Sequence, residues 1–217
     1  LFPNQPLLSR RESDQSKADF QFSLFSHSLG AGVATRVAGL FPEYIESLFL
    51  VESLGASSST AEQNVKRVRS MIARNTYMLE RKARPYKSFD EAVDRIVKTN
   101  PHIARQSVET MLKRGLVLKG DSYYFRHDGR LTGTTPHQSE EEVQALIKRI
   151  DCPVLLVWAE KRFYTLSTSL VEERQKLIDA QKLMVVNLPG TGHHVHIDQP
   201  KLVFEYVKKF FTKYGLT

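Results

Sequence analysis

The sequence predicts an α/β fold in which a mostly parallel sheet is flanked by helices and interrupted by a mainly helical cap insertion. Apolar and aromatic runs alternate with helical patterns toward both ends of the 217-residue chain, as in βαβ units. The middle of the chain carries helix-capping signals and a hairpin signal instead. A hydrophobic content of 41% and a charged content of 25% are ordinary for a globular protein, so the chain can bury a core.

The first unit that we expect is strand, helix, strand. Residues 1–19 are polar and contain proline, and we expect irregular structure or a short helix there. Phe20 to Phe25 is apolar and aromatic, which predicts a strand, and Ser47 to Val51 predicts a second, buried strand. Leu29 to Leu40 is small and apolar, which predicts a helix packed closely on a sheet. Because both strands are continuous apolar runs, we expect parallel pairing and assign 1–55 to the core.

Residues 56–138 are predicted to form the insertion. One helical face is indicated by the spacing of Val65, Val68, Ile72 and Leu79. A small hairpin is indicated by the apolar runs 116–118 and 123–125 on either side of Gly120 and Asp121. Four capping boxes of the Ser-x-x-Glu type mark helix starts here and beyond: Ser59 with Glu62, Ser88 with Glu91, Ser139 with Glu142, and Ser169 with Glu172.

Residues 139–217 are predicted to return to the core. A helical face is indicated by Val143, Leu146, Ile147 and Ile150. Val154 to Trp158 and Leu183 to Val186 read as strands, with a helix from Ser169 to Ala180 between them. Pro200 opens a last helix and Gly215 ends it. The residues of that helix expected to face the sheet are Val203, Val207, Phe210 and Phe211.

Charge and cysteine content narrow the class of protein. The net charge is +7 and the pI about 9.5, yet the basic residues are spread along the chain, often beside acids. We therefore expect a solvated basic surface and no nucleic-acid partner. The single cysteine, Cys152, cannot form an internal disulfide, which favours an intracellular and cytoplasmic protein. A peroxisomal or other organellar location stays open, and no run of residues indicates a signal peptide or a membrane span.

The most informative stretch is a serine between a predicted strand and a predicted helix. Ser28 has Ser26 and Gly30 two positions to either side, which approximates the G-x-S-x-G nucleophile elbow. The turn is sharp, so those neighbours must be small, and serine in place of glycine still satisfies this. We expect the Ser28 hydroxyl to be exposed at the top of the sheet. We expect the backbone N–H of Leu29, at the start of a helix, to face a developing oxyanion.

A serine nucleophile needs a base, and in this type of fold a histidine follows the last strand. His193 directly follows the flexible loop Gly190-Thr191-Gly192, and we choose it as the base. His194 and His196 are expected to pack or support the site. We do not favour a metal site, because these histidines lack a set of carboxylate partners.

The base also needs an orienting acid, for which two positions compete. Glu52 closes the apolar run Leu50-Val51, where an unpartnered carboxylate would be costly. Glu160 follows the Val154–Trp158 strand. Two residues after it, where an aspartate would be expected, the sequence has Arg162. We favour Glu52, because functional groups gather at the carboxyl ends of parallel strands, and keep Glu160 as the alternative.

These segments resemble the α/β-hydrolase superfamily, and within it the serine hydrolase-like proteins, over about Phe20 to Phe211. The superfamily motifs are His27-Ser28-Leu29-Gly30, the strand end at Glu52, and Pro189-Gly190-Thr191-Gly192-His193-His194. The segments closer to the serine hydrolase-like proteins are 50–55, 81–86, 100–102, 114–116 and 124–131. The resemblance implies the C-terminal portion of an α/β-hydrolase fold, with a cap over the site.

The resemblance also implies a chemistry. The acid at Glu52 is placed as in the haloalkane dehalogenase and coelenterazine luciferase branch, which carries an aspartate at the elbow; Ser28 instead favours an acyl-enzyme. We expect hydrolysis of a small apolar carboxylic ester by a Ser28–Glu52–His193 triad, with no metal or organic cofactor. The cap side chains that we expect to pack or to line the acyl pocket are Met71, Met78, Leu79 and Met111.

One departure from the family motivates an alternative function. Nothing in residues 1–19 resembles the family's N-terminal portion, which carries the first strands and the His-Gly loop that supplies a second oxyanion N–H. Without it, we expect the Phe20–Phe25 edge to be exposed and to promote self-association. The alternative is therefore a non-catalytic binding or regulatory α/β-hydrolase-like fragment.

Overall fold

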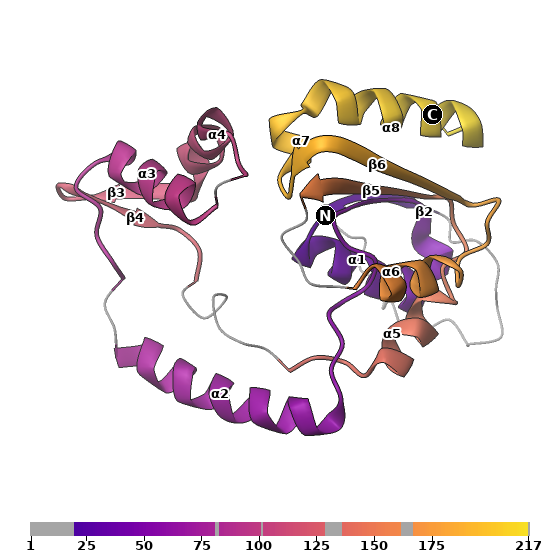
Figure 1. The fold of residues 1–217 in the computed structure, drawn as a ribbon, viewed down its shortest axis with the longest axis horizontal. Helices are drawn as coiled ribbons and strands as arrows, with labels where there is room; N and C mark the ends of the chain where they lie inside the picture. The colour runs from indigo at the N-terminus through magenta and orange to yellow at the C-terminus, as the bar shows by residue number, and fades with distance from the viewer. Residues whose placement is uncertain (1–19, 81–82, 101, 129–135, 162–166, 217) are drawn as a thin grey trace.

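A four-stranded parallel sheet forms the centre of the computed structural model, which describes residues 20–80, 83–100, 102–128, 136–161 and 167–216 (Figure 1). Its strands are β1 (Phe22–His27), β2 (Ile45–Val51), β5 (Val154–Lys161) and β6 (Leu183–Gly192). They lie in the order β1-β2-β5-β6, and each neighbouring pair is parallel. The predicted parallel α/β fold is confirmed.

Helices cover both faces of this sheet, because the central strands are apolar on both sides. On one face lie α1 (Leu29–Leu40), α5 (Glu140–Ile147) and α6 (Thr168–Gln175), packed over Leu48, Leu50 and Leu156. On the other lie α7 (Val195–Asp198) and α8 (Pro200–Tyr214), packed over Phe49, Val51 and Val157. Figure 1 shows α8 and α1 on opposite sides of the strands. A short 3-10 helix, η1 (Pro42–Tyr44), joins α1 to β2.

The segment between β2 and α5 adds no strand to the central sheet among the described residues. It forms α2 (Ala61–Glu80), α3 (Phe89–Thr99), α4 (Arg105–Gly115) and the antiparallel hairpin of β3 (Leu116–Lys119) and β4 (Ser122–Phe125). Its own apolar cluster includes Tyr86, Val93, Val108, Leu112 and Leu116. Placing residues 56–138 together as a separate cap stays a proposal.

Several local predictions are confirmed. The hairpin turns at Gly120, whose φ is 58°, and α8 ends at Gly215, whose φ is 63°. The Ser139 hydroxyl accepts a hydrogen bond from Glu142 N at 3.2 Å, and the Glu142 carboxylate accepts one from Ser139 N at 2.7 Å. The predicted sheet-facing side of α8 also packs on the core, through Val203, Val207, Phe210 and Phe211.

Two of the four predicted capping boxes are wrong by one or two residues. Helix α2 begins after Thr60, whose hydroxyl accepts from Gln63 N at 3.2 Å and whose N–H donates to the Gln63 amide oxygen at 2.9 Å, so Ser59 is not the cap. Helix α6 begins after Ser167, not after Ser169. In both places neighbouring hydroxyl residues can cap equally well, so spacing alone does not select one.

Helix α2 differs from the other helices in what its apolar residues contact. Val65 is 71% exposed and Ile72 is 58% exposed, although their spacing predicts one helical face. The apolar cluster of the insertion is instead built from α3, α4 and the hairpin, and α2 lies apart from them in Figure 1. No helix in the described part of the chain is long and apolar enough to cross a membrane.

Candidate active site

Ser28 is the single residue between β1 and α1. Its φ of 54° and ψ of −118° lie outside the regions that non-glycine residues favour, a conformation that costs about 1–3 kcal/mol and is kept where the surroundings hold it. Here its N–H donates to the Val51 carbonyl at 2.8 Å, and its carbonyl accepts from Ala31 N at 2.9 Å. The strand on one side and the helix on the other therefore fix the serine at the carboxyl end of the sheet.

The two positions on either side of Ser28 lie close to each other. A Cβ at Gly30 would lie 3.9 Å from the Ser26 Cβ, which is an ordinary van der Waals contact. Ser26, which replaces the elbow glycine, uses its hydroxyl to donate to the Phe49 carbonyl at 3.1 Å. Leu29 is the first residue of α1, and its N–H therefore has no acceptor within the helix.

His193 lies between Ser28 and Glu52. Its Nε2 is 3.0 Å from the Ser28 Oγ, and its Nδ1 is 3.1 Å from the Glu52 Oε2. Because an ionised carboxylate only accepts, Nδ1 carries the proton and Nε2 is free to accept from the serine hydroxyl. The histidine side chain is 11% exposed and that of the glutamate 2%, which shields both bonds from water.

Glu52 and Glu160, the two candidates for the triad acid, have different hydrogen-bond partners. Glu52 follows β2 with a φ of 62°, and its Oε1 also accepts from Ala159 N at 2.5 Å. A buried carboxylate with two donors is a stable arrangement. Glu160 is exposed, and its Oε2 accepts from Gly190 N at 2.5 Å, so it braces the loop that leads to His193.

Three more histidines lie near His193: His27, His194 and His196. The sequence patterns assigned no role to His27. The ring of His27 lies 4.6 Å from that of His193, 5.2 Å from that of His194 and 4.2 Å from that of His196, centroid to centroid. Burial, with His196 next in importance, lowers the pKa of His27 to about 3. Burial likewise lowers the pKa of His196 to about 4 and also lowers that of His194. The described residues contain no group of three or more His, Cys, Asp or Glu arranged to hold a metal ion.

A cavity of about 290 Å³ lies where the insertion meets the ends of β5 and β6. It is lined by His102, Ile103, Ala104, Lys161, Gly190 and Gly192. A Cβ at Gly192 would lie 2.5 Å from the His102 carbonyl oxygen, so glycine is needed for this close approach. Of the apolar cap residues expected to pack or line a pocket, Met111 packs within the insertion, whereas the side chains of Met78 and Leu79 fall outside the described residues.

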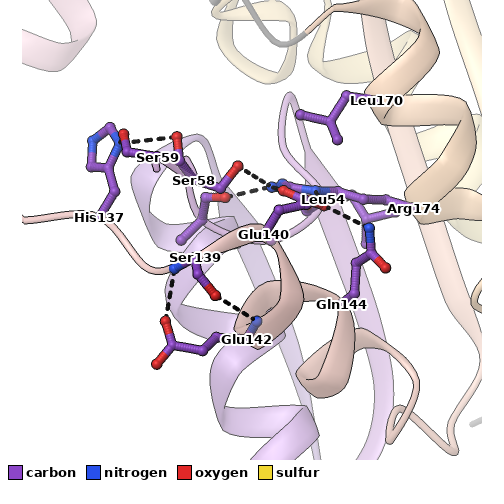
Figure 2. A network of polar contacts seen from close by, with 12 residues as sticks. Leu54, Ser58, Ser59, His137, Ser139, Glu140, Glu142, Gln144, Leu170 and Arg174 are labelled. Atoms are coloured by element: carbon purple, nitrogen blue, oxygen red, sulfur yellow. Dashed lines mark hydrogen bonds and ion pairs between the residues drawn. The ribbon is translucent and has the colours of Figure 1, made fainter. Parts of the chain in front are cut away.

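The segment that follows Glu52 is held by a buried arginine. Arg174, which is fully buried, donates to the carbonyls of Leu54 at 2.8 Å and Ala56 at 3.0 Å, and it pairs with both carboxylate oxygens of Glu140 at 3.0 and 2.6 Å (Figure 2). Burial opposes ionisation of Glu140, but hydrogen bonds from Arg174 and Ser58 outweigh it and lower the pKa of this carboxyl. The network joins α6, α5 and the exit from β2.

Comparisons with known proteins find similar sequences over most of the chain. The profile described as "Alpha/beta hydrolase family" matches residues 11–206. A serine hydrolase-like protein of Dictyostelium discoideum is 28% identical over 201 residues, which cover 87% of this chain and 55% of that protein. The serine hydrolase-like protein of Danio rerio is 25% identical over 198 residues, or 88% of this chain and 60% of that one. The chain thus spans less than two thirds of the length of these relatives.

Solved structures show the same fold. The crystal structure of a hypothetical protein from Pseudomonas aeruginosa PAO1 has a TM-score of 0.77 at 25% identity and covers 91% of this chain and 68% of that one. An esterase of Mycobacterium tuberculosis has a TM-score of 0.65 at 21% identity, covering 88% of this chain and 62% of that one. At this level of identity the second likeness concerns the fold alone.

Proposed function

Because the chain belongs to the α/β-hydrolase family, we propose that it is a serine-dependent hydrolase of carboxylic esters with Ser28 as nucleophile. His193 is the base and Glu52 is the acid that orients it. The observation that carries the proposal is the pair of hydrogen bonds at His193, 3.0 Å to the Ser28 Oγ and 3.1 Å to the Glu52 Oε2. These distances are within the range that proton transfer requires.

The reaction proceeds in two halves. The Ser28 Oγ attacks the ester carbonyl carbon while its proton passes to the His193 Nε2, and the protonated imidazole then gives that proton to the departing alkoxide. Water attacks the resulting acyl-enzyme, losing a proton to His193, and the acid product leaves as Ser28 regains its proton. Glu52 stabilises the imidazolium through Nδ1, and the Leu29 N–H stabilises the oxyanion.

The substrate that we infer is a small ester. The support is the cavity of about 290 Å³ beside Gly192, whose lining residues include Ile103 and Ala104 but whose exposed surface is mainly polar. A volume of this size is at the lower end for small-molecule sites. An acyl-length series of p-nitrophenyl esters, compared between the native chain and Ile103→Ala, tests this inference. If the chain-length preference does not change, the cavity is not the acyl site.

A fluorophosphonate probe tests the triad directly. We expect the probe to label the native chain and to leave Ser28→Ala unlabelled, since the probe reacts with an activated serine. Glu52→Gln is expected to slow labelling by about two to four orders of magnitude through loss of the oriented base. Glu160→Gln is the matched control and is expected to label at nearly the native rate. Labelling that persists in Ser28→Ala would refute the proposal.

A second candidate is a non-catalytic binding or regulatory protein. The observation in its favour is the edge strand β1, where Phe25 is 56% exposed, in a chain that spans 55% of the length of one relative. This candidate predicts a folded, self-associating chain that neither labels at Ser28 nor hydrolyses esters. The same labelling comparison separates the two candidates, because only the hydrolase gives a signal that Ser28→Ala removes.

A further inference from the structure

Ser28 and His193 approach each other from opposite edges of the sheet. Ser28 follows β1 and His193 follows β6, and β2 and β5 lie between these strands. With strands about 4.8 Å apart, the chain at the end of β6 must cross the ends of two strands to bring His193 to the serine. Gly190 and Gly192 lie in this last part of β6, and they allow the path but do not hold it in place.

His27 supplies a bond that does hold it. This residue is the last of β1, and its Nε2 is 2.8 Å from the backbone carbonyl oxygen of His193, 166 residues further along the chain. A carbonyl oxygen only accepts, so Nε2 must carry the hydrogen. The two imidazole rings are also in contact, with their centroids 4.6 Å apart. The residue before the nucleophile is therefore bonded to the main chain of the base.

The geometry points to His27 as a positioning residue, whose Nε2–H bond to the His193 carbonyl holds the base within reach of Ser28. The inference rests on the proposed function for its catalytic consequence, and on the contacts alone for its structural content. His27 exchanges no proton with the substrate. It fixes the distance between the His193 Nε2 and the Ser28 Oγ, over which the proton is transferred. Small changes in that distance lower the reaction rate strongly.

The protonation state of His27 suits this role. The titratable side chains in ring contact with it are His193, His194 and His196, and burial lowers its pKa to about 3. The ring is therefore neutral over the whole range in which a serine hydrolase works. It adds no positive charge that would oppose protonation of His193, and its bond persists unchanged across that range.

The structural content is tested by ¹⁵N-histidine NMR of the native chain between pH 5 and 8. We expect His27 to show the Nε2–H neutral form throughout, without titration. We also expect a downfield Nδ1–H signal from His193 to be present in the native chain and in His27→Gln, whose amide nitrogen replaces Nε2, and to be lost or broadened in His27→Phe. Titration of His27, an Nδ1–H form, or equal His193 signals in both variants would overturn the inference.

The catalytic consequence is tested with the same variants by fluorophosphonate labelling and ester turnover. We expect His27→Phe to lower kcat and the labelling rate by about 10- to 100-fold with little change in KM, and His27→Gln to stay close to native. Thermal unfolding controls for folding. Equal losses in both variants would also overturn the inference. If the native chain shows no labelling that depends on Ser28, the proposed function fails, and the NMR result decides the role of His27.

Discussion

Ser28 and Glu52 are the non-glycine residues with positive φ in the described part of the chain, at 54° and 62°. Such backbones are costly, and they persist where the surrounding contacts leave no alternative. Each of the two has its N–H bonded to the carbonyl of a neighbouring strand, Ser28 to Val51 and Glu52 to Val157. Both strained residues contact His193, so the strain is concentrated in the candidate triad.

The partly buried histidines beside the triad predict a pH dependence of stability. Burial lowers the pKa of His27 to about 3 and of His196 to about 4, against 6.5 in the unfolded chain. Between these values the unfolded chain binds more protons, so the free energy of unfolding falls as pH falls below about 6.5 and is fully restored above it. Each group contributes less than about 1.4 kcal/mol per pH unit, because both rings are partly exposed.

Thermal unfolding midpoints at pH 5, 6 and 7 measure this effect. We expect the midpoint to fall from pH 7 to pH 5, and to fall less in His196→Gln, which removes one of the groups that must stay neutral. His102→Gln is the control, since His102 lies outside this cluster. A midpoint that is as pH-dependent in His196→Gln as in the native chain would contradict the assignment.

At the scale of elements, α1 and α5 meet at a glycine. A Cβ at Gly39 would lie 2.4 Å from the Leu146 carbonyl oxygen and 2.9 Å from the Leu146 Cα, so the backbones of two helices would have to separate. We expect Gly39→Ala to lower the free energy of unfolding by about 1–3 kcal/mol.

Gly30→Ala, in the same helix, is the matched control for Gly39→Ala. The nearest atom to its new Cβ is 3.9 Å away, and we expect it to be neutral or stabilising by up to about 1 kcal/mol. Urea unfolding measures both variants. Equal effects of the two substitutions would show that the approach of α1 to α5 does not limit the residue at position 39.

The Arg174 network is the second feature at this scale. Replacing Arg174 by Met would leave Glu140 without its cation and the carbonyls of Leu54 and Ala56 without a donor. We expect a loss of about 3–5 kcal/mol in urea unfolding. Lys66→Ala, which breaks a pair in which both side chains are more than 75% exposed, is expected to change stability very little. A small loss in Arg174→Met would mean that the segment after Glu52 is held by other contacts.

At the scale of the whole molecule, the main feature is the exposed edge of the sheet at β1. Within the described residues β1 pairs with β2 alone, and Phe25 on this strand is 56% exposed. An aromatic, apolar edge strand is a template for pairing with another chain. We therefore expect the 217-residue chain to self-associate with rising concentration.

Light scattering over a concentration series tests this prediction. Phe25→Lys places a charge on the edge and is expected to lower the average mass toward that of a monomer. Ile72→Lys, at an exposed apolar position on α2, is the control for nonspecific association through exposed apolar side chains. A native chain that is monomeric throughout, or equal effects of the two substitutions, would argue against association through β1.

The sequence by itself determined much of the local structure and predicted candidate site residues at the strand ends. Helix α1 has the predicted bounds, Leu29–Leu40, and α8 begins at Pro200 and ends before Gly215 as predicted. Ser28 and His193 could be selected because a small-residue turn and a glycine loop are local patterns. The carboxyl ends of parallel strands share one edge of the sheet, so residues that close such strands could be expected to meet there.

Only the tertiary structure decided which of these residues touch. It brings Glu52, and not Glu160, to His193, it bonds His27 to the His193 carbonyl, and it gathers Leu54, Ala56 and Glu140 around Arg174. It also leaves the apolar Val65 and Ile72 of α2 exposed. The physical reason is range: periodicity and capping act between residues a few positions apart, whereas these contacts join residues 34 to 166 positions apart and depend on strand order and packing.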